Sequence, residues 1–184
     1  MENSSKSKLP HDRKARVVAV SGGFDPLHVG HVRHFEAAKK LGDKLVVILN
    51  NDNWLRLKKG FVFMPAKERK EIIEAFSCVD KVVLTSHTRN TKDISICEEL
   101  KKIRPHIFAK GGDRTLENIP EPAVCKEIGC KMVFNVGKGG KVQSSSRLIN
   151  AVKKNGSKIE RPWGCDINSK VQKYKYLKIR QSIE

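Results

Sequence analysis

Apolar residues along the chain fall into short unbroken runs that alternate with segments of helical spacing. The runs lie at about 16–21, 44–50, 81–84, 106–109 and 131–136, and each predicts a strand. Helical spacing between the runs predicts helices at about 29–41, 65–76, 93–103, 123–128 and 144–153. Unbroken apolar strands that alternate with helices are typical of a parallel sheet covered on both faces. The sequence therefore predicts an α/β fold, a Rossmann-like five-stranded parallel sheet with helices on both faces.

Glycine and proline refine the ends of these elements. Gly42 is expected to cap the end of the first helix, and Pro65 suits the first turn of the next. That second helix is expected to turn Ile72, Ile73 and Phe76 inward. The segment 51–64, which is polar and aromatic, is expected to be a loop.

Length and composition predict the domain boundaries and argue against a membrane-spanning protein. The length of 184 residues favours one domain, here 16–153, with a disordered basic arm at 1–15 and a basic extension at 154–184. The net charge of +17 is spread along the chain and fits a phosphorylated ligand, a nucleic acid or plain solubility. No apolar run is long enough to span a membrane. Five cysteines without a C-x-x-C pair favour reduced thiols and a cytoplasmic location.

Unusual polar stretches follow four of the five predicted strands. They lie at 21–31, 50–59, 110–114 and 137–147. Ligands of open α/β sheets bind outside the carboxyl ends of the strands. We therefore expect these four stretches to meet at one ligand site.

The stretch 21–31 carries the most specific chemistry. Gly22 and Gly23 let the backbone approach a phosphate closely, and His28 and His31 share one face at the start of a helix, where anions bind readily. Histidines at this spacing are also compatible with ordinary packing or with a metal pair. Their position directly after a strand and a double glycine favours ligand chemistry.

The same stretch resembles a known signature. His28-Val-Gly-His31 with Gly23-Phe24-Asp25 resembles the His-x-Gly-His motif of the nucleotidyltransferase (cytidylyltransferase-like) superfamily, and the resemblance extends over about 16–152. Leu57-Lys58-Lys59-Gly60 resembles its second-strand loop, whose lysine contacts phosphates, and Lys67-Glu68-Arg69 resembles its next helix start.

Two later motifs complete the resemblance. The run from Lys110 through Gly112 to Asp113 resembles the heptose-1-phosphate adenylyltransferase branch, and the segment from Gln143 to Ile149 resembles the superfamily's Ile-Ser-Thr-Thr motif. The arginine that often precedes that motif is absent, so Lys138 or Lys141 would have to supply the cation. Residues 160–178 resemble the start of a mannose-6-phosphate isomerase-like cupin, or form a plain basic tail.

The resemblance implies a set of site residues and partners. The catalytic residues would be His28, His31 and Lys58, and the acceptor would contact Asp25, Lys58 and Arg69. A nucleoside triphosphate, ATP or CTP, would contact a larger set: Gly22, Gly23, Phe24, Asp25, Gly30, Lys110, Gly112, Asp113, Ser144, Ser145, Ser146 and Arg147. Mg²⁺ would be held by phosphate oxygens and water, with no protein ligand assigned. A homodimer is expected, and neither a nucleic acid nor a membrane is an expected partner.

The chemistry of nucleotidyl transfer explains why such residues suffice. A phosphate oxygen attacks the α-phosphorus in line, and because that nucleophile is already ionised, positioning and charge neutralisation replace a general base. Lys58 is favoured over Lys59 from its distance after His31. Asp25 could orient an acceptor, accept a backbone N–H or help to hold Mg²⁺. Ser144 to Ser146 could bind phosphates or simply cap the last helix.

The function predicted from the sequence is transfer of AMP or CMP to a phosphorylated sugar or polyol, with a sugar 1-phosphate favoured. The alternatives are a glycerol-3-phosphate-type cytidylyltransferase, a basic nucleic-acid-binding protein on the same fold, and an aminoacyl-tRNA-synthetase-like fragment. A nucleic-acid binder has no need of both histidines, which is why the enzyme is preferred.

Overall fold

The computed structural model describes residues 14–111, 120–137 and 143–155. The chain divides into two units, 1–148 and 149–184, and the fold described below is that of the first unit. No helix among the described residues is long and apolar enough to cross a membrane.

Five parallel strands form one sheet in the order β3-β2-β1-β4-β5. In the centre, β1 (Val17–Gly22) pairs with β2 (Lys44–Leu49) on one side and with β4 (Ile107–Ala109) on the other. The edges are β3 (Lys81–Leu84) and β5 (Lys131–Val133). This arrangement confirms the predicted α/β fold with a five-stranded parallel sheet.

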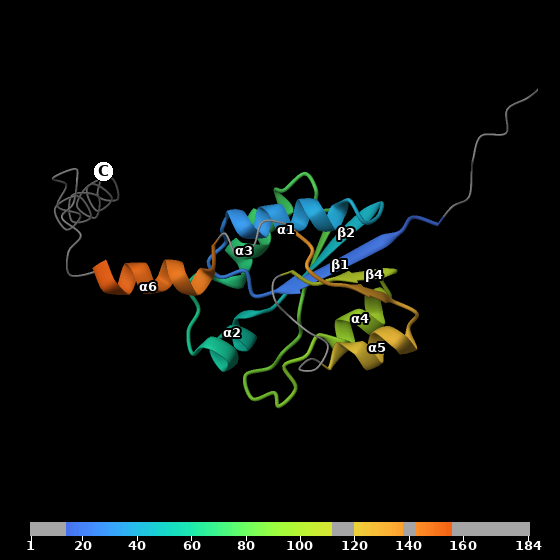
Figure 1. Ribbon diagram of the computed structural model, residues 1–184. Helices are drawn as coiled ribbons and strands as arrows, with labels where there is room; N and C mark the ends of the chain where they lie inside the picture. The colour runs from blue at the N-terminus through green and yellow to red at the C-terminus, as the bar shows by residue number, and fades with distance from the viewer. Residues whose placement is uncertain (1–13, 112–119, 138–142, 156–184) are drawn as a thin grey trace, which may run out of the picture. The chain divides into compact units, whose positions relative to one another are not determined.

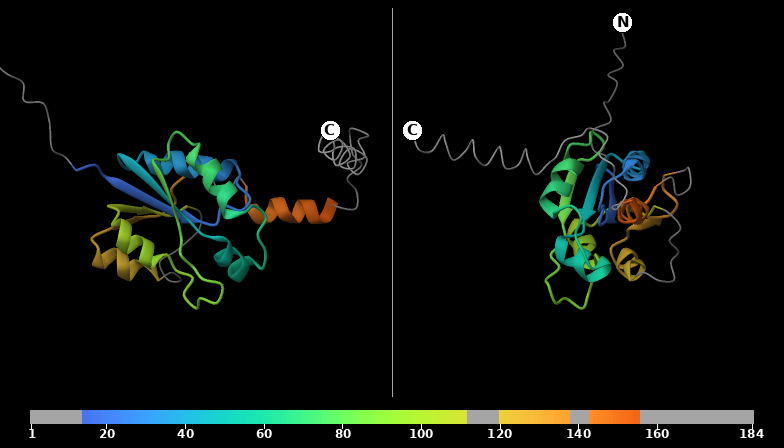
Figure 2. Two further views of the ribbon diagram at one scale, coloured as in Figure 1. Left: turned by 180° about the vertical axis from the view of Figure 1, so that it is seen from behind. Right: turned by 90° about the vertical axis from the view of Figure 1, so that its left-hand side faces the viewer.

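Helices cover both faces of the sheet, as the opposite views in Figures 1 and 2 show. One face carries α1 (Val29–Lys39) and α3 (Ala66–Glu74), and the other carries α4 (Cys97–Ile103) and α5 (Glu121–Glu127). The remaining helices are α2 (Asp52–Lys59) and α6 (Ser145–Asn155), of which α6 begins in the first unit.

Each face has its own apolar core. Phe35 of α1 and Ile73 of α3 pack with Val18 and Val20 of β1, and all four are fully buried. On the other face Phe108 of β4 is one member of a cluster with residues of α4 and α5. Burying one such side chain contributes about 1.5–3 kcal/mol, so the two clusters hold the sheet rigid beneath its carboxyl edge.

The helix α2 was expected to be a loop, and that prediction is wrong. The side chain of Asn51 accepts a hydrogen bond from the N–H of Trp54, which caps the start of the helix. Gly60 ends it with a left-handed φ of 81°, and Leu55 is fully buried. One buried residue in a polar segment gives little periodic signal, although the cap and the terminal glycine were both visible in the sequence.

Smaller differences concern the ends and faces of helices. Helix α1 ends at Lys39 with Lys40 as its cap, so Gly42 does not cap it. A Cβ on Gly42 would lie 2.7 Å from the carbonyl oxygen of Arg16, which explains the glycine by close approach instead. Ile72 is 40% exposed, whereas its neighbour Ile73 is buried as predicted. The last helix continues beyond 153, where the predicted domain ends, to Asn155.

Candidate functional site

Two histidines cap the start of α1 reciprocally. The Nδ1 atom of His28 accepts a hydrogen bond from the N–H of Gly30 at 3.1 Å, and the Nδ1 atom of His31 accepts from the N–H of His28 at 3.3 Å. Because Nδ1 is the acceptor in both rings, each neutral imidazole carries its proton on Nε2. Each ring therefore keeps an Nε2–H donor that this capping does not use.

The two imidazoles are stacked and electrically neutral. Their ring centroids lie 3.7 Å apart with an interplanar angle of 22°. Burial, together with the charges of His28, His34 and Lys59, lowers the pKa of His31 to about 3. Burial is also the main cause that lowers the pKa of His28. At neutral pH the pair can thus donate hydrogen bonds without carrying charge.

Phe24 and Gly30 support this pair. Phe24 is only 6% exposed. Its ring packs edge-on against the rings of His31 and Phe35, with 5.0 Å between the ring centroids in both cases. The side chain of Phe24 therefore supports the ring of His31, whereas a contact with the nucleotide was predicted for it. A Cβ on Gly30 would lie 3.0 Å from the ring of His28, so glycine is what lets that ring fold over the first helical turn.

Asp25 anchors the segment that precedes α3. Its carboxylate is fully buried and accepts two backbone hydrogen bonds, from the N–H of Phe63 at 2.8 Å and of Met64 at 2.7 Å. Of the three predicted roles, backbone acceptance is the one present, although the donors lie outside the turn itself. Because the side chain is fully buried, its carboxylate is not open to an acceptor or a metal ion, and neither of those two roles fits it.

Lys59 is the lysine that reaches the turn. Its Nζ donates to the carbonyl oxygen of Asp25 at 3.1 Å, and burial lowers its pKa. Its charge also contributes to the lowered pKa values of His28 and His31. Lys58, predicted to be the catalytic lysine, is exposed on α2. The structure therefore favours Lys59 for the role that the sequence analysis gave to Lys58.

Arg69 lies beneath the turn and is fully buried. Its Nε donates to the carbonyl of Met64 at 2.8 Å. Its Nη1 donates to the carbonyls of Gly23 at 2.6 Å and Asn50 at 2.8 Å. Its Nη2 forms an ion pair with Asp52 at 2.7 Å. The acceptor-binding role predicted for Arg69 does not fit these contacts. Instead the guanidinium joins the ends of β1 and β2 to α2 and α3.

The start of α6 meets the same turn. The hydroxyl of Ser145 donates to the carbonyl of Pro26 at 3.0 Å. Ser144 accepts a hydrogen bond from the N–H of Arg147 at 3.2 Å, which is the simple capping role. Ser146 and Arg147 are exposed. The structure thus places the start of α6 against the turn at Pro26.

Lys110, predicted to contact the nucleotide, is instead buried and paired. Its Nζ lies 3.4 Å from Oε1 of Glu121 and 4.5 Å from the ring centroid of Phe108. Glu121 was not predicted as a partner, because an acidic residue in the first turn of a helix is usually explained by the helix dipole. Gly112 and Asp113 lie outside the described residues, as do Lys138 and Lys141.

The described residues contain no group of three histidine, cysteine, aspartate or glutamate side chains that could hold a metal ion. Asp52, like Asp25, is already engaged, since it pairs with Arg69. Both carboxylates are therefore engaged with other parts of the protein.

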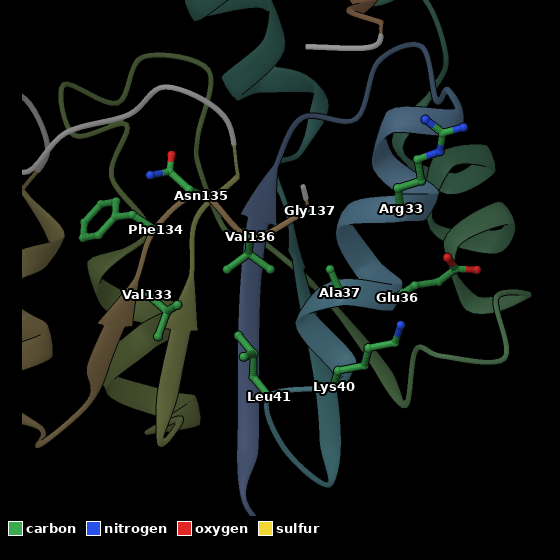
Figure 3. Close-up of a pocket in the computed structure, with 10 residues that line it drawn as sticks. All are labelled: Arg33, Glu36, Ala37, Lys40, Leu41, Val133, Phe134, Asn135, Val136 and Gly137. Carbon is green, nitrogen blue, oxygen red and sulfur yellow. The ribbon is translucent and has the colours of Figure 1, made fainter. Parts of the chain in front are cut away.

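A separate cavity of about 500 Å³ lies between α1 and the segment that follows β5. Its centre is apolar, with Leu41, Val133 and Val136 facing one another (Figure 3). In the same view the charged ends of Glu36 and Lys40 turn away from that centre. Because no polar groups converge inside it, this crevice does not resemble a site for a phosphorylated ligand.

Comparisons with known proteins agree with this geometry. The family model described as "Cytidylyltransferase-like" matches residues 19–136. Over 144 residues the chain is 35% identical to the bifunctional protein HldE of Citrifermentans bemidjiense, which covers 77% of this chain and 28% of that protein. It is 37% identical to the FAD synthase of Pyrococcus abyssi over 122 residues, which covers 66% of this chain and 78% of that enzyme.

The chain thus spans only about a quarter of the length of the HldE relatives it matches. A solved structure, the lipopolysaccharide core biosynthesis protein from Thermoplasma volcanium, superposes with a TM-score of 0.54 at 23% identity. That match covers 66% of this chain and 94% of the other, and it supports the fold.

Proposed function

Because the chain belongs to the cytidylyltransferase-like family, we propose that it is a nucleotidyltransferase whose reaction takes place at the turn formed by residues 22–31. It transfers AMP or CMP from a nucleoside triphosphate to a phosphorylated acceptor and releases pyrophosphate. One observation carries this proposal: two neutral imidazoles present Nε2–H donors side by side, next to a half-buried lysine.

The geometry suits an in-line displacement at phosphorus. An ionised oxygen of the acceptor phosphate forms the new bond to the α-phosphorus, the bond to the bridging oxygen breaks, and pyrophosphate leaves with the electron pair. His28 and His31 donate through Nε2 to oxygens of the triphosphate, while Lys59 supplies a positive charge that acts on both rings. Donors held in place before the substrate arrives need no reorganisation during the reaction.

The remaining phosphate contacts are assigned to the start of α6. Ser145 already donates its hydroxyl to Pro26, so we assign it a backbone contact, whereas Ser146 and Arg147 are exposed and free to face phosphates. Mg²⁺ would arrive with the triphosphate as part of the substrate, held by phosphate oxygens and water. The homodimer and the cytoplasmic location remain predictions.

A sugar 1-phosphate is the favoured acceptor. The resemblance of Lys110 and its neighbours to the heptose branch supports this choice, and so does the similarity to proteins named HldE. The chain is also similar to enzymes named FAD synthase, so phosphorylated acceptors other than sugar phosphates remain candidates. A polyol phosphate used with CTP is the second candidate.

A screen for pyrophosphate release tests the reaction. Four nucleoside triphosphates would be paired with a panel of sugar 1-phosphates and polyol phosphates, with the nucleotidylated product identified by mass. We expect turnover with ATP or CTP and a sugar 1-phosphate, whereas turnover with CTP and glycerol 3-phosphate supports the second candidate. No release with any pair, together with RNA binding that weakens steeply with salt, would contradict the proposal.

Two neighbouring lysines give a matched pair of variants. Lys59→Met should lower kcat by roughly 10²–10³-fold, the cost typical of losing one electrostatic donor, while Lys58→Met should stay within about twofold of the wild type. The reverse order of effects would return the role to Lys58 and show that the contact between Lys59 and Asp25 is only structural.

A further inference from the structure

Helix α2, which carries Lys59, is attached to the rest of the fold largely by polar contacts. Leu55 is its single buried residue, and Leu57 is 47% exposed. Leu55 packs against the histidine turn, since a Cβ on Gly23 would lie 2.8 Å from its Cδ2 atom. A short helix with one buried apolar side chain gains little stability from packing, so its hydrogen bonds decide where it lies.

The hydrogen bonds at the start of α2 converge on Asn51. Its backbone N–H donates to Oγ1 of Thr85 at 3.0 Å. Its side-chain Nδ2 donates to the carbonyls of Thr85 at 3.0 Å and His87 at 2.8 Å. Its Oδ1 accepts from the N–H of Trp54 at 3.0 Å. With one amide group, Asn51 therefore both caps α2 and joins it to the segment 85–95 that follows β3.

The segment 85–95 is itself held by the imidazole of His87. Nδ1 of His87 lies 2.8 Å from Oγ1 of Thr85, and Nε2 lies 2.9 Å from the carbonyl oxygen of Ser95. Because a carbonyl can only accept, Nε2 of the neutral ring carries the proton and Nδ1 accepts from the hydroxyl of Thr85. From the N–H of Asn51 to the carbonyl of Ser95, each hydrogen bond thus has one donor and one acceptor, which gives the segment a defined arrangement.

Two further contacts join α2 to the same segment. Nδ2 of Asn53 donates to the carbonyl of His87 at 2.9 Å, and Nε1 of Trp54 donates to the carbonyl of Ile94 at 2.8 Å. Figure 1 shows the segment as the green loop beside α2. The helix is therefore attached near both ends of the segment.

The other end of α2 reaches the histidine turn. Lys59 is the last residue of the helix, and its Nζ donates to the carbonyl of Asp25 at 3.1 Å. A helix of 8 residues extends about 12 Å, so a change in the direction of α2 at Asn51 displaces Lys59 more than any other residue of the helix. Misplacing a reacting group by about 1 Å can cost roughly 10²-fold in rate.

Resting on the proposed function, we propose that Asn51 is a positioning residue for Lys59. It holds the start of α2 against the segment 85–95, so that the ammonium at the far end of the helix lies at the turn where the reaction takes place. Asn51 does not contact the substrate and acts on the reaction only through Lys59. The helix and the segment thus work as one part of the site.

The variant Asn51→Asp separates this attachment from helix capping. Its carboxylate keeps an oxygen for the N–H of Trp54, because aspartate and asparagine are similar N-caps, but it removes the N–H donors to Thr85 and His87. We expect kcat to fall roughly tenfold or more, while KM for the triphosphate stays within about twofold. Asn90→Asp is the matched control, because it makes the same chemical change at an exposed position of the same segment.

A double-mutant cycle with Lys59→Met separates positioning from a general loss of structure. If Asn51 acts through Lys59, then Asn51→Asp should change kcat by less than about twofold in the Lys59→Met background. The same fold-decrease in both backgrounds overturns the inference, and so does an unchanged kcat in folded Asn51→Asp.

A second pair of variants decides the question if Asn51→Asp fails to fold. Thr85→Val removes the hydroxyl that links Asn51 to His87 and keeps the shape of the side chain, whereas Thr85→Ser keeps the hydroxyl. We expect Thr85→Val to lower kcat roughly tenfold and Thr85→Ser to stay within about twofold of the wild type. Equal kcat values for the two variants overturn the inference. A wild type that turns over no pair of nucleotide and acceptor contradicts the proposed function itself, which is a distinct outcome.

Discussion

Two regions of the molecule differ in how completely their buried polar groups form hydrogen bonds. The first is the histidine turn, residues 22–31 with Arg69 beneath it, and the second is the buried ion pair of Lys110 and Glu121. At the turn, both oxygens of Asp25 accept hydrogen bonds and the guanidinium of Arg69 has four partners. At the other edge, a carboxylate oxygen of Glu121 has no donor among the described residues. The first region is rigid before any ligand binds, which suits positioning of a reaction. The second is less completely paired, because the described residues supply no donor for one oxygen of Glu121.

The largest loss in the free energy of unfolding is expected when the turn loses the guanidinium of Arg69. Arg69→Met leaves the side chain of Asp52 and three carbonyl oxygens without their partner, so it should lower the free energy of unfolding by about 3–5 kcal/mol. Lys70→Met, which removes an exposed pair with Glu74 next along the helix, should cost less than about 1 kcal/mol. Chemical denaturation measures both, and equal losses would show that the network beneath the turn is not central.

A substitution of Asp25 should cause the second-largest loss in the free energy of unfolding, after that of Arg69. Asp25→Asn replaces one of two acceptor oxygens by a donor that faces a backbone N–H, so it should cost about 2–3 kcal/mol of unfolding free energy. The segment before α3 should then exchange its amide protons faster, with Phe63 and Met64 the most affected. Unchanged protection at these two amides would contradict the anchoring role.

The histidine pair should make stability depend on pH. An unfolded histidine binds its proton near pH 6.5, whereas the pKa of folded His31 is about 3, so the unfolded state binds more protons between these values. Stability should therefore be full above pH 6.5 and fall as the pH decreases, by about 2 kcal/mol at pH 5 for this residue. His31→Gln should flatten the decline in a series of denaturation curves. A decline of the same slope would show that His31 is not held neutral by the fold.

The smallest effect concerns the start of α6. Ser145→Ala removes one hydrogen bond to Pro26 and should cost about 1 kcal/mol, whereas Ser146→Ala at an exposed position should be nearly neutral. Thermal unfolding of the two variants side by side gives the difference. Identical melting temperatures would mean that the hydroxyl of Ser145 does not hold this segment to the turn.

Much of the fold could be predicted from the sequence because its signals are local. Unbroken apolar runs such as that before Asn50 identify buried parallel strands, and a double glycine before two histidines predicts a ligand-binding turn. Helix α2 was missed because Leu55 is its single buried residue.

The partners of charged side chains were harder to predict. Arg69 looks like a surface or ligand-binding residue, yet three of its partners are backbone carbonyls, which leave no trace in the sequence. The choice between Lys58 and Lys59 depends on which side of a short helix faces Asp25, and that helix had not been predicted. Glu121 could not be linked to Lys110 because their contact spans eleven positions of the chain.

The most direct test of the account is pyrophosphate release by His31→Ala, measured with the nucleotide and acceptor that the wild type prefers. The account predicts a kcat lowered by roughly 10²–10³-fold, because one of the two Nε2–H donors is gone, in a protein that remains folded by circular dichroism. An unchanged kcat in the folded variant would contradict the assignment of the reaction to this turn.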